Sequence, residues 1–227
     1  MGTDTVKHHL PSDIERTSMK IITEELAERG IVLQPGTEAV VKRVIHATAD
    51  FDYAENLVFL NNPVTSAIRS LTEDHVPLIT DTNMALSGLS RKALSQLDCR
   101  ADCYMADPEV AAAARADATT RAAAAMRKAA RDDAGAVLAV GNAPTALFTI
   151  ADLMETGLRP ALIVAVPVGF VNVVEAKEKI IGICTRTGTP AIVARGRKGG
   201  STVATAICNA LLYSTTDMLD PSRRGWN

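Results

Sequence analysis

The stretch Ala136-Val-Leu-Ala-Val140, followed at once by Gly141-Asn-Ala-Pro-Thr145, decides the fold class. Consecutive apolar residues that end at a glycine turn are typical of a strand buried on both faces. The proline after the turn favours the first position of a helix. Four further stretches combine a short apolar run with a helical segment after it: 76–80, 99–105, 161–166 and 190–194. Strands that alternate with helices predict parallel βαβ units, and therefore an α/β protein with a five-stranded parallel sheet.

Helical patterns occupy the chain between and after these runs. They are expected at 90–97, 108–132, 144–156, 172–181 and 200–213, with a break near 117–119, because Asp and Thr favour helix caps over interiors. Before residue 76 the apolar residues recur with helical spacing, which predicts helices at about 12–30, from 37 onward, and at 63–73. We therefore expect an N-terminal helical part, residues 1–75, and an α/β core, residues 76–227, joined as one integrated domain.

The composition is that of an ordinary globular protein, with 227 residues of which 47% are hydrophobic and 22% charged. A net charge of -2 with scattered basic residues argues against nucleic-acid binding, which depends on neutralising phosphates. The longest apolar run, Ala161 to Val171, is shorter than the roughly 20 residues that span a bilayer, so no membrane segment is expected. The N-terminus lacks the apolar core of a signal peptide, which predicts a cytoplasmic protein, and His8 and His9 are expected in a mobile tail.

The four cysteines, Cys99, Cys103, Cys184 and Cys208, lack the spacing of a secreted disulfide framework. The gap between Cys99 and Cys103 also differs from the two-residue gap of zinc ribbons and redox motifs. We interpret all four as reduced, buried small hydrophobic residues rather than as metal ligands or redox groups, and we expect no metal site.

In open parallel sheets, ligands bind beyond the carboxyl ends of the strands. Most residues that follow the predicted strands are small, polar or glycine-rich, as a binding rim requires: 81–84, 107, 141–145, 167–170 and 196–201. The glycines and cations of Gly196-Arg-Lys-Gly-Gly-Ser201 favour an anion, and a flexible turn with solvated cations is the alternative. Asn142 and Asp81 could each contact a ligand or cap local backbone, and capping is the more common role of such an asparagine.

His46 is the candidate proton-transfer group. Lys42, Arg43 and His46 lie on one side of the second predicted helix, where the two cations lower the imidazole pKa. Asp50 and Asp52, just downstream, could raise it. A histidine tuned in this way is suited to general acid or base chemistry on an anionic substrate. The alternative is a histidine packed where the helices meet the core.

The other charged residues include one candidate for substrate binding and one group that is expected to face solvent. Arg121, at the start of a helix after the predicted break, could reach a substrate carboxylate, and a solvated cation is the alternative. Glu175, Lys177, Glu178 and Lys179 are expected to form a charged helix face in solvent.

Four motifs together resemble the precorrin-8X methylmutases of cobalamin biosynthesis. They are, in order, Val41-Lys-Arg-Val-Ile-His-Ala-Thr-Ala-Asp-Phe-Asp52, Gly141-Asn-Ala-Pro-Thr-Ala-Leu147, Val166-Pro-Val-Gly-Phe-Val171 and Gly196-Arg-Lys-Gly-Gly-Ser201. The similarity extends from about Pro11 to Leu212. The resemblance implies a homodimer with a three-layer flavodoxin-like core of five parallel strands and an added N-terminal helical subdomain. It also implies an isomerase that moves a methyl group from C-11 to C-12 of the tetrapyrrole precorrin-8, or of its cobalt complex, to give hydrogenobyrinic acid or the cobalt-containing cobyrinic counterpart, without a cofactor.

The resemblance also implies residue roles. His46 matches the family's catalytic histidine, which transfers a proton to or from the macrocycle, and Ser18 matches a serine at the substrate. Ser90 stands where the family has a threonine, a departure that keeps the hydroxyl but weakens the assignment. The other residues implied at the substrate are Asp81, Thr82, Arg121, Asn142, Thr145, Val168, Gly169, Phe170, Arg197, Lys198, Gly199 and Ser201. Arg43 is a further candidate, because its charge complements the carboxylates of such a substrate.

The metal state of the substrate depends on the branch of the family. The stretch Ala47-Thr-Ala-Asp-Phe-Asp52 looks more like the branch that acts on the cobalt complex, and cobalt would then arrive inside the substrate. Hand-over of the tetrapyrrole to neighbouring pathway enzymes is a further expectation. Two alternatives stay open: a carrier that binds a tetrapyrrole without chemistry, and a protein that binds FMN or another phosphate at 196–201.

Overall fold

The computed structural model describes residues 10–225, so His8 and His9 lie outside the described residues. Within them, the strands form one six-stranded sheet in the order β1-β6-β5-β4-β2-β3. Strands β2 to β6 run parallel to one another, and β1 pairs antiparallel with β6. The strands are β1 (Leu57–Leu60), β2 (Leu78–Thr80), β3 (Ala101–Asp102), β4 (Val137–Val140), β5 (Leu162–Ala165) and β6 (Ala191–Ala194).

The expected five-stranded sheet is wrong in its strand number, because Leu57–Leu60 adds a sixth strand within the part predicted to be helical. A run of four apolar residues cannot be distinguished from a helical segment by periodicity. The strand expected at 99–105 is also too long, since β3 ends at Asp102 and Tyr104–Ala106 forms the 3-10 helix η1. The Asp102 carboxylate accepts the Cys103 N–H at 3.1 Å where the ladder ends.

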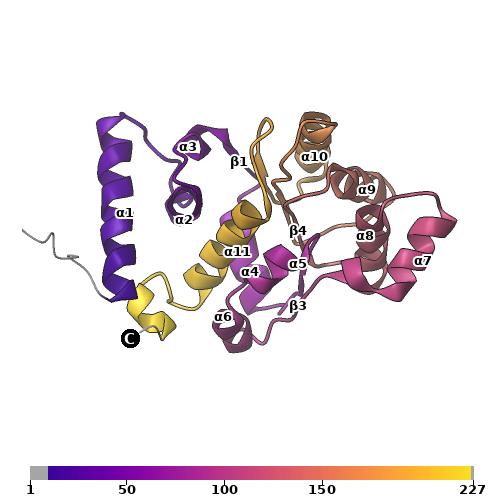
Figure 1. Ribbon diagram of the computed structural model, residues 1–227, viewed down its shortest axis with the longest axis horizontal. Helices are drawn as coiled ribbons and strands as arrows, with labels where there is room; N and C mark the ends of the chain where they lie inside the picture. Colours follow the sequence, from indigo (N-terminus) through magenta and orange to yellow (C-terminus); the bar gives the residue numbers. More distant parts are fainter. Residues whose placement is uncertain (1–9, 226–227) are drawn as a thin grey trace, which may run out of the picture.

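Helices cover both faces of the sheet, and each face has its own apolar core (Figure 1). Along β5, Leu162 and Val164 belong to one core and Ile163 and Ala165 to the other, as the two-residue period of a strand requires. The first face carries α4 (Pro63–Thr72), α5 (Asn83–Ser87), α6 (Arg91–Gln96) and α11 (Ser201–Thr215); the second carries α8 (Arg121–Asp132), α9 (Pro144–Glu155) and α10 (Val173–Thr187), with α7 (Pro108–Ala116) packed on α8.

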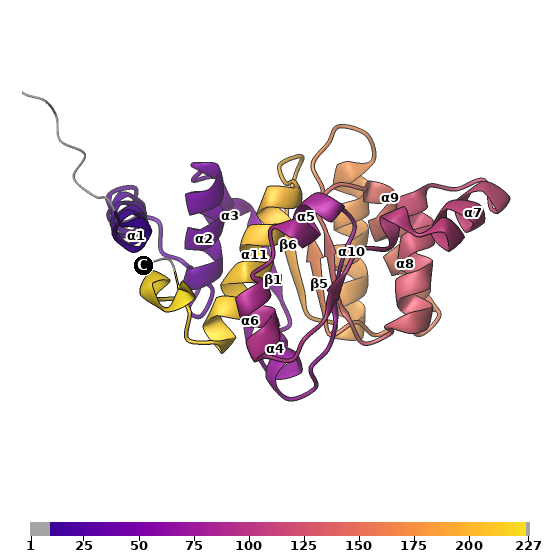
Figure 2. The ribbon, with the colours of Figure 1, turned by 60° about the horizontal axis from the view of Figure 1, so that its bottom comes forward.

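The N-terminal helices form a further layer beyond α11 (Figures 1 and 2). Helix α2 (Glu38–Thr48) packs along α11, and its buried residues are Val40, Val41, Val44 and Ile45. Helix α1 (Pro11–Glu28) lies outside α2 and contacts the 3-10 helix η2 (Pro221–Arg224), while the short α3 (Tyr53–Asn56) leads into β1. The apolar core on this side of the sheet therefore contains residues from both sides of position 76.

Two local predictions are confirmed. The break expected near 117–119 is present, because α7 ends at Ala116 and α8 begins at Arg121, where the Thr120 hydroxyl accepts the Ala123 N–H at 3.1 Å. All four cysteines are free and buried. Burial raises the pKa of the Cys184 and Cys208 thiols to about 12, which keeps them protonated and unreactive.

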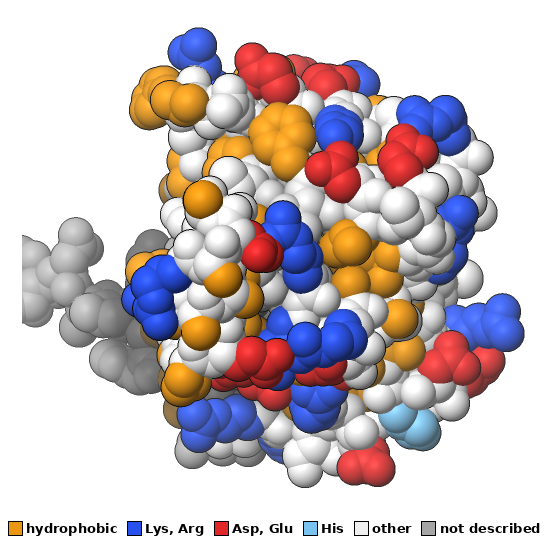
Figure 3. Space-filling view, turned by 90° about the vertical axis from the view of Figure 1, so that its right-hand side faces the viewer, with side chains coloured by type: hydrophobic (Ala, Val, Ile, Leu, Met, Phe, Trp, Pro, Cys, Tyr) orange, Lys and Arg blue, Asp and Glu red, His pale blue; other side chains and the backbone are white. Residues whose placement is uncertain are grey.

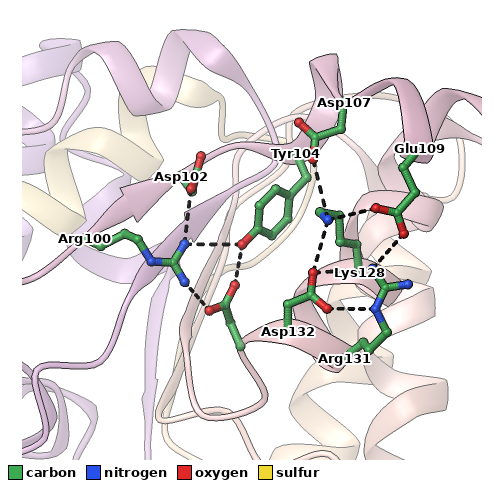
Figure 4. A network of polar contacts seen from close by, with 9 residues as sticks. Arg100, Asp102, Tyr104, Asp107, Glu109, Lys128, Arg131 and Asp132 are labelled. Carbon is green, nitrogen blue, oxygen red and sulfur yellow. Dashed lines mark hydrogen bonds and ion pairs between the residues drawn. The ribbon is translucent and has the colours of Figure 1, made fainter.

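The end of the molecule formed by α7 and α8 carries interleaved acidic and basic side chains (Figure 3). Lys128 Nζ lies 3.0 Å from the Glu109 carboxylate and 3.1 Å from that of Asp132 (Figure 4). The Tyr104 hydroxyl donates to Asp133 beside them. Because these charges neutralise one another, neither sign prevails at this end of the molecule.

Candidate functional site

His46 lies in the wall of a cavity of about 610 Å³ between α1 and α2. Its Nδ1 is 2.7 Å from the hydroxyl oxygen of Ser18, which projects from α1. Helical spacing explains the arrangement, because Val44 and Ile45 pack into the core and leave His46 at the border between the core and the cavity. The residues that line the cavity are Ile14, Thr17, Ser18, Ile21, Ile22, Glu25, Arg29, Ile45, His46, Ala49 and Phe51.

The surroundings of His46 favour its neutral form. Burial lowers the pKa of His46 below its ordinary value, and the Arg43 guanidinium on the same helix lowers it further, against a smaller opposite effect of Glu15. The neutral form of the imidazole is therefore favoured over the charged form.

A buried ion-pair network supports this pair of side chains. The Glu15 carboxylate, on the same helix as Ser18, accepts Arg43 Nη2 at 2.6 Å and Arg224 Nη1 at 2.6 and 2.7 Å. Only 7% of the Glu15 side chain and 3% of the Arg224 side chain are exposed. Burial alone would raise the pKa of Glu15, but the hydrogen bonds from both arginines leave it below its ordinary value. Arg43 is therefore paired with Glu15, whereas the sequence predicted that it binds substrate.

Lys198 connects the cavity to the loop after β6. Its Nζ lies 2.6 Å from an Asp50 oxygen and 2.5 Å from an Asp52 oxygen, and hydrogen bonds to the two carboxylates raise the pKa of Lys198. The residue on each side of Asp50 lines the His46 cavity. The expectation that Asp50 and Asp52 raise the pKa of His46 is wrong, because both carboxylates face Lys198.

Asp81, directly after β2, organises the rim at the carboxyl ends of the strands. It is 1% exposed, and its carboxylate accepts the backbone N–H groups of Gly141, Asn142 and Ala143 at 2.8, 2.9 and 2.8 Å. Burial raises the pKa of Asp81, and these three bonds partly offset that effect. The strand order reverses between β2 and β4, so Asp81 spans the topological switch point where such sheets bind ligands. The sequence left two roles open for Asp81, contact with a ligand and capping of local backbone. In the structure its carboxylate holds local backbone.

Two glycines allow the loops after β4, β5 and β6 to touch. A Cβ atom on Gly199 would lie 2.1 Å from the Val166 carbonyl oxygen, and one on Gly141 would lie 2.8 Å from the Ser201 Cα. Both distances are too short for contact with backbone atoms, so only glycine fits. The Thr82 hydroxyl lies 2.8 Å from the Ser201 hydroxyl and joins the end of β2 to the start of α11. The structure therefore brings the predicted site residues Thr82, Gly199 and Ser201 together at the rim.

The loop between β5 and α10 is an exposed part of this rim. Phe170 is 82% exposed and Val168 is 47% exposed. The Arg197 guanidinium carbon lies 5.5 Å from the centre of the Phe170 ring, and the Gly169 N–H donates to the Arg197 carbonyl at 3.3 Å. An exposed aromatic ring beside a cation suits a flat apolar ligand that bears carboxylates.

Arg121 and Thr145, two further predicted site residues, lie beside the loop after β4. The Thr145 hydroxyl is 2.9 Å from the Thr120 hydroxyl, which places Arg121, the first residue of α8, next to the start of α9. Arg121, Asn142 and Thr145 are all exposed. Asn142 is held through its backbone N–H by Asp81, which leaves its side chain in solvent.

Ser90 has a local role in the chain. Its hydroxyl accepts the Ala93 N–H at 3.3 Å and caps α6, and its own N–H donates to the Asn209 side chain at 2.8 Å. These contacts attach the start of α6 to α11, and they account for a hydroxyl at this position without a ligand.

Lys177 is buried, so its prediction as part of a solvent-facing charged group is wrong. Lys177 is 0% exposed, whereas the neighbouring charged residues of α10 are exposed as predicted. Its Nζ donates to the carbonyl oxygens of Gly196 and Lys198 at 2.9 and 2.8 Å. A signal was present in the sequence, because helical spacing puts position 177 on the same face as the buried Val173 and Ile180.

Two further observations bear on ligand classes. Among residues 10–225, no three His, Cys, Asp or Glu side chains are grouped so that they could hold a metal ion. Every helix in this described part of the chain is too short or too polar to cross a bilayer.

Comparison with known proteins identifies the family. The family model described as CbiC, precorrin-8X methylmutase, matches residues 13–214. The chain belongs to this family. It is 41% identical to the cobalt-precorrin-8 methylmutase of Salmonella typhimurium, covering 89% of this chain and 95% of that protein. It is 34% identical to the precorrin-8X methylmutase of Pseudomonas aeruginosa, covering 87% and 93%.

A solved structure agrees with this assignment. The precorrin-8X methylmutase from Thermus thermophilus superposes with a TM-score of 0.80 at 35% identity, covering 90% of this chain and 98% of that chain. The resemblance found in the sequence is confirmed. The chain is an enzyme, a methyl-transferring isomerase of cobalamin biosynthesis.

Proposed function

We propose that the chain moves a methyl group from C-11 to C-12 of cobalt-precorrin-8, with His46 as the proton-transfer residue. The observation that carries this proposal is the Ser18–His46 pair, 2.7 Å apart, in the wall of a cavity of about 610 Å³. Relatives at 41% and 39% identity are named cobalt-precorrin-8 methylmutases, and relatives at 34% and 35% identity are named precorrin-8X methylmutases. The higher identities favour the cobalt complex as substrate.

In this proposal the neutral imidazole acts first as a base. Burial and the nearby Arg43 lower the pKa of His46, so at neutral pH the ring can accept a proton from the substrate and return it after the shift. When Nδ1–H donates to the Ser18 hydroxyl, Nε2 is the nitrogen that accepts the proton. Ser18 thereby orients the ring.

The rim supplies the proposed contacts to the substrate. Arg121 and Arg197 are exposed there and are the cations proposed to bind the substrate's carboxylates. The exposed Phe170 is proposed to contact the apolar ring. Arg43 and Lys198 are paired with carboxylates of the protein itself, so neither is proposed to bind substrate.

Other properties of the family form part of the same proposal. The reaction requires no cofactor, and cobalt enters with the substrate. The chain forms a homodimer, acts in the cytoplasm and hands its product to neighbouring pathway enzymes. Its parallel strands follow the order β3-β2-β4-β5-β6, which is the flavodoxin-like order and supports placing the core, after an N-terminal helical part, in that fold class.

The test is conversion of substrate by the purified chain. It is mixed separately with enzymatically prepared cobalt-precorrin-8 and with metal-free precorrin-8, and the absorption spectrum and mass are followed. Because the reaction is a rearrangement, the cobalt form should change its spectrum at constant mass. Conversion of the metal-free form alone would reassign the substrate. Binding of both forms without conversion would indicate a carrier, and release of flavin on denaturation would indicate an FMN-binding protein.

Variants test the role of His46. His46→Ala should bind the substrate but convert it about 10²–10⁴-fold more slowly. His75→Ala is the control, since it removes a histidine whose Nδ1 contacts the Leu97 carbonyl oxygen, and it should leave turnover unchanged. Wild-type turnover should rise with pH through a pKa below 6.5 and then level off. A rate that falls with rising pH through that pKa would make His46 the acid instead.

A further inference from the structure

Lys177 places a charged group on the buried face of α10. It is 0% exposed, and its ammonium group donates to two backbone carbonyls, those of Gly196 at 2.9 Å and Lys198 at 2.8 Å. Burial lowers the pKa of Lys177 to about 8, because removal of a charge from water is unfavourable. An apolar side chain of similar length would fill the same space without that cost. The core therefore does not account for a lysine at this position.

The loop that Lys177 contacts, residues 196–200, has a tightly constrained backbone. Gly196 and Gly200 have φ angles of +74° and +131°, which residues with side chains rarely adopt. Gly199 lies against the Val166 carbonyl without room for a Cβ atom, and the Gly200 N–H donates to the same carbonyl at 2.8 Å. The end of β5 holds this loop through Gly199 and Gly200, and Lys177 holds it through the Gly196 and Lys198 carbonyls.

From this loop, contacts continue to the His46 cavity. The Lys198 side chain, whose own carbonyl accepts from Lys177, is bound by Asp50 and Asp52. These aspartates follow the helix that carries His46, and the residues flanking Asp50 form part of the cavity wall. A shift of the loop would therefore move both the wall of the cavity and the rim.

We propose that Lys177 is a positioning residue for the methyl transfer. It fixes the 196–200 loop so that Lys198 holds the Asp50–Asp52 segment at the His46 cavity while Arg197 stays at the rim. Lys177 is buried and acts through the loop, not on the substrate. The inference rests on the proposed function, since it assigns a role within that same site. A displacement of about 1 Å in a site of this kind can cost about 100-fold in rate.

The test compares Lys177→Met with Lys179→Met. The first variant keeps the length of the buried side chain and removes its donors. The second is the matched control, because Lys179 lies on the same helix with 40% of its side chain exposed and pairs with Asp152 at 2.6 Å. Lys177→Met should remain folded and lower kcat about 10- to 100-fold. Backbone amides of 196–200 should exchange with solvent about tenfold faster than in the wild type. Lys179→Met should change neither quantity.

Each outcome is informative about Lys177 separately from the proposed function. If the wild type converts neither form of precorrin-8, the proposed function fails, and the exchange rates at 196–200 still decide whether Lys177 holds the loop. If the wild type is active and Lys177→Met keeps kcat and KM within about twofold, or if Lys179→Met loses as much activity, the positioning role is overturned. Should Lys177→Met fail to fold, Lys177→Gln, which keeps an N–H donor, replaces it. Failure of both variants to fold would assign Lys177 to the fold and overturn the proposal.

Discussion

The cavity between α1 and α2 and the rim at the strand ends are stabilised by different kinds of polar contact. Beside the cavity, on α1, α2 and η2, charged side chains from distant parts of the chain bind one another, as Glu15, Arg43 and Arg224 do. At the rim, single buried charges bind backbone groups: Asp81 accepts three N–H groups, and Lys177 donates to two carbonyls. Loss of Glu15 would leave two guanidinium groups buried without their shared carboxylate, whereas the rim loops keep their glycine contacts when a single charge is lost. The cavity should therefore be the more easily disrupted of the two.

The largest effect expected from this comparison is that of Glu15→Ala. The substitution leaves the Arg43 and Arg224 guanidinium groups buried without their carboxylate, which should lower the free energy of unfolding by about 3–5 kcal/mol. Glu24→Ala on the same helix is the control, since Glu24 is 59% exposed and lies 3.8 Å from Lys20; its effect should be below about 1 kcal/mol. Urea unfolding measures both. Equal effects would show that the network does not hold the cavity.

Asp81→Asn should have a smaller effect. An asparagine cannot accept all three N–H groups of 141–143, and each buried donor left without a partner costs about 1–3 kcal/mol, so a loss of about 2 kcal/mol is expected. Asp152→Asn, at a side chain that is 68% exposed, should be nearly neutral in the same urea series. If Asp81→Asn destabilises the chain as much as Glu15→Ala, the contrast between the two regions is wrong.

Ser18→Ala tests orientation within the cavity without disturbing its charges. The substitution removes the hydroxyl 2.7 Å from His46 Nδ1, so kcat should fall about tenfold, while the unfolding free energy changes by about 1 kcal/mol or less. Ser18→Thr keeps the hydroxyl and should restore most of the rate. Steady-state kinetics measures kcat for both variants. An inactive Thr variant beside an active Ala variant would exclude an orienting role for the Ser18 hydroxyl.

The smallest expected effect is the contribution of His46 to stability. Its folded-state pKa is lowered, so the folded chain binds this proton less readily than the unfolded chain. His46 therefore contributes stability that is present above pH 6.5 and is lost as the pH falls through the lower, folded-state pKa. Urea unfolding across this range should show a steeper loss for the wild type than for His46→Asn. Parallel curves would mean that His46 titrates alike in both states.

The sequence predicted the central strands well, because a strand buried on both faces is apolar at every position. The runs at 136–140, 161–166 and 190–194 contain β4, β5 and β6 in full. It did not predict Leu57–Leu60 as a strand, since that pairing depends on β6, far away in the chain. Local pattern carries no information about a distant partner.

The site residues also divide into those that local pattern predicts and those that depend on contacts between distant segments. The position of His46 beside the apolar face of its helix, and the lowering effect of Arg43 on its pKa, followed from local spacing, whereas burial, the largest cause of the lowered pKa, depends on the folded chain. The pairing of Arg43 with Glu15, and of Lys198 with Asp50, joins segments whose proximity only the folded chain creates. Both cations were for that reason assigned to a substrate. Charges on a sequence can be counted, but their partners are a property of the tertiary structure.

The antiparallel pairing of β1 with β6 also sets an order of events during synthesis. Leu57 is opposite Ala194, and Glu15 binds Arg224, so the first helices and strand emerge from the ribosome long before their partners exist. Contacts between such distant segments form slowly and leave apolar surface exposed in the interval. The helix that bears His46 is thus made well before the downstream segments that complete its working surroundings.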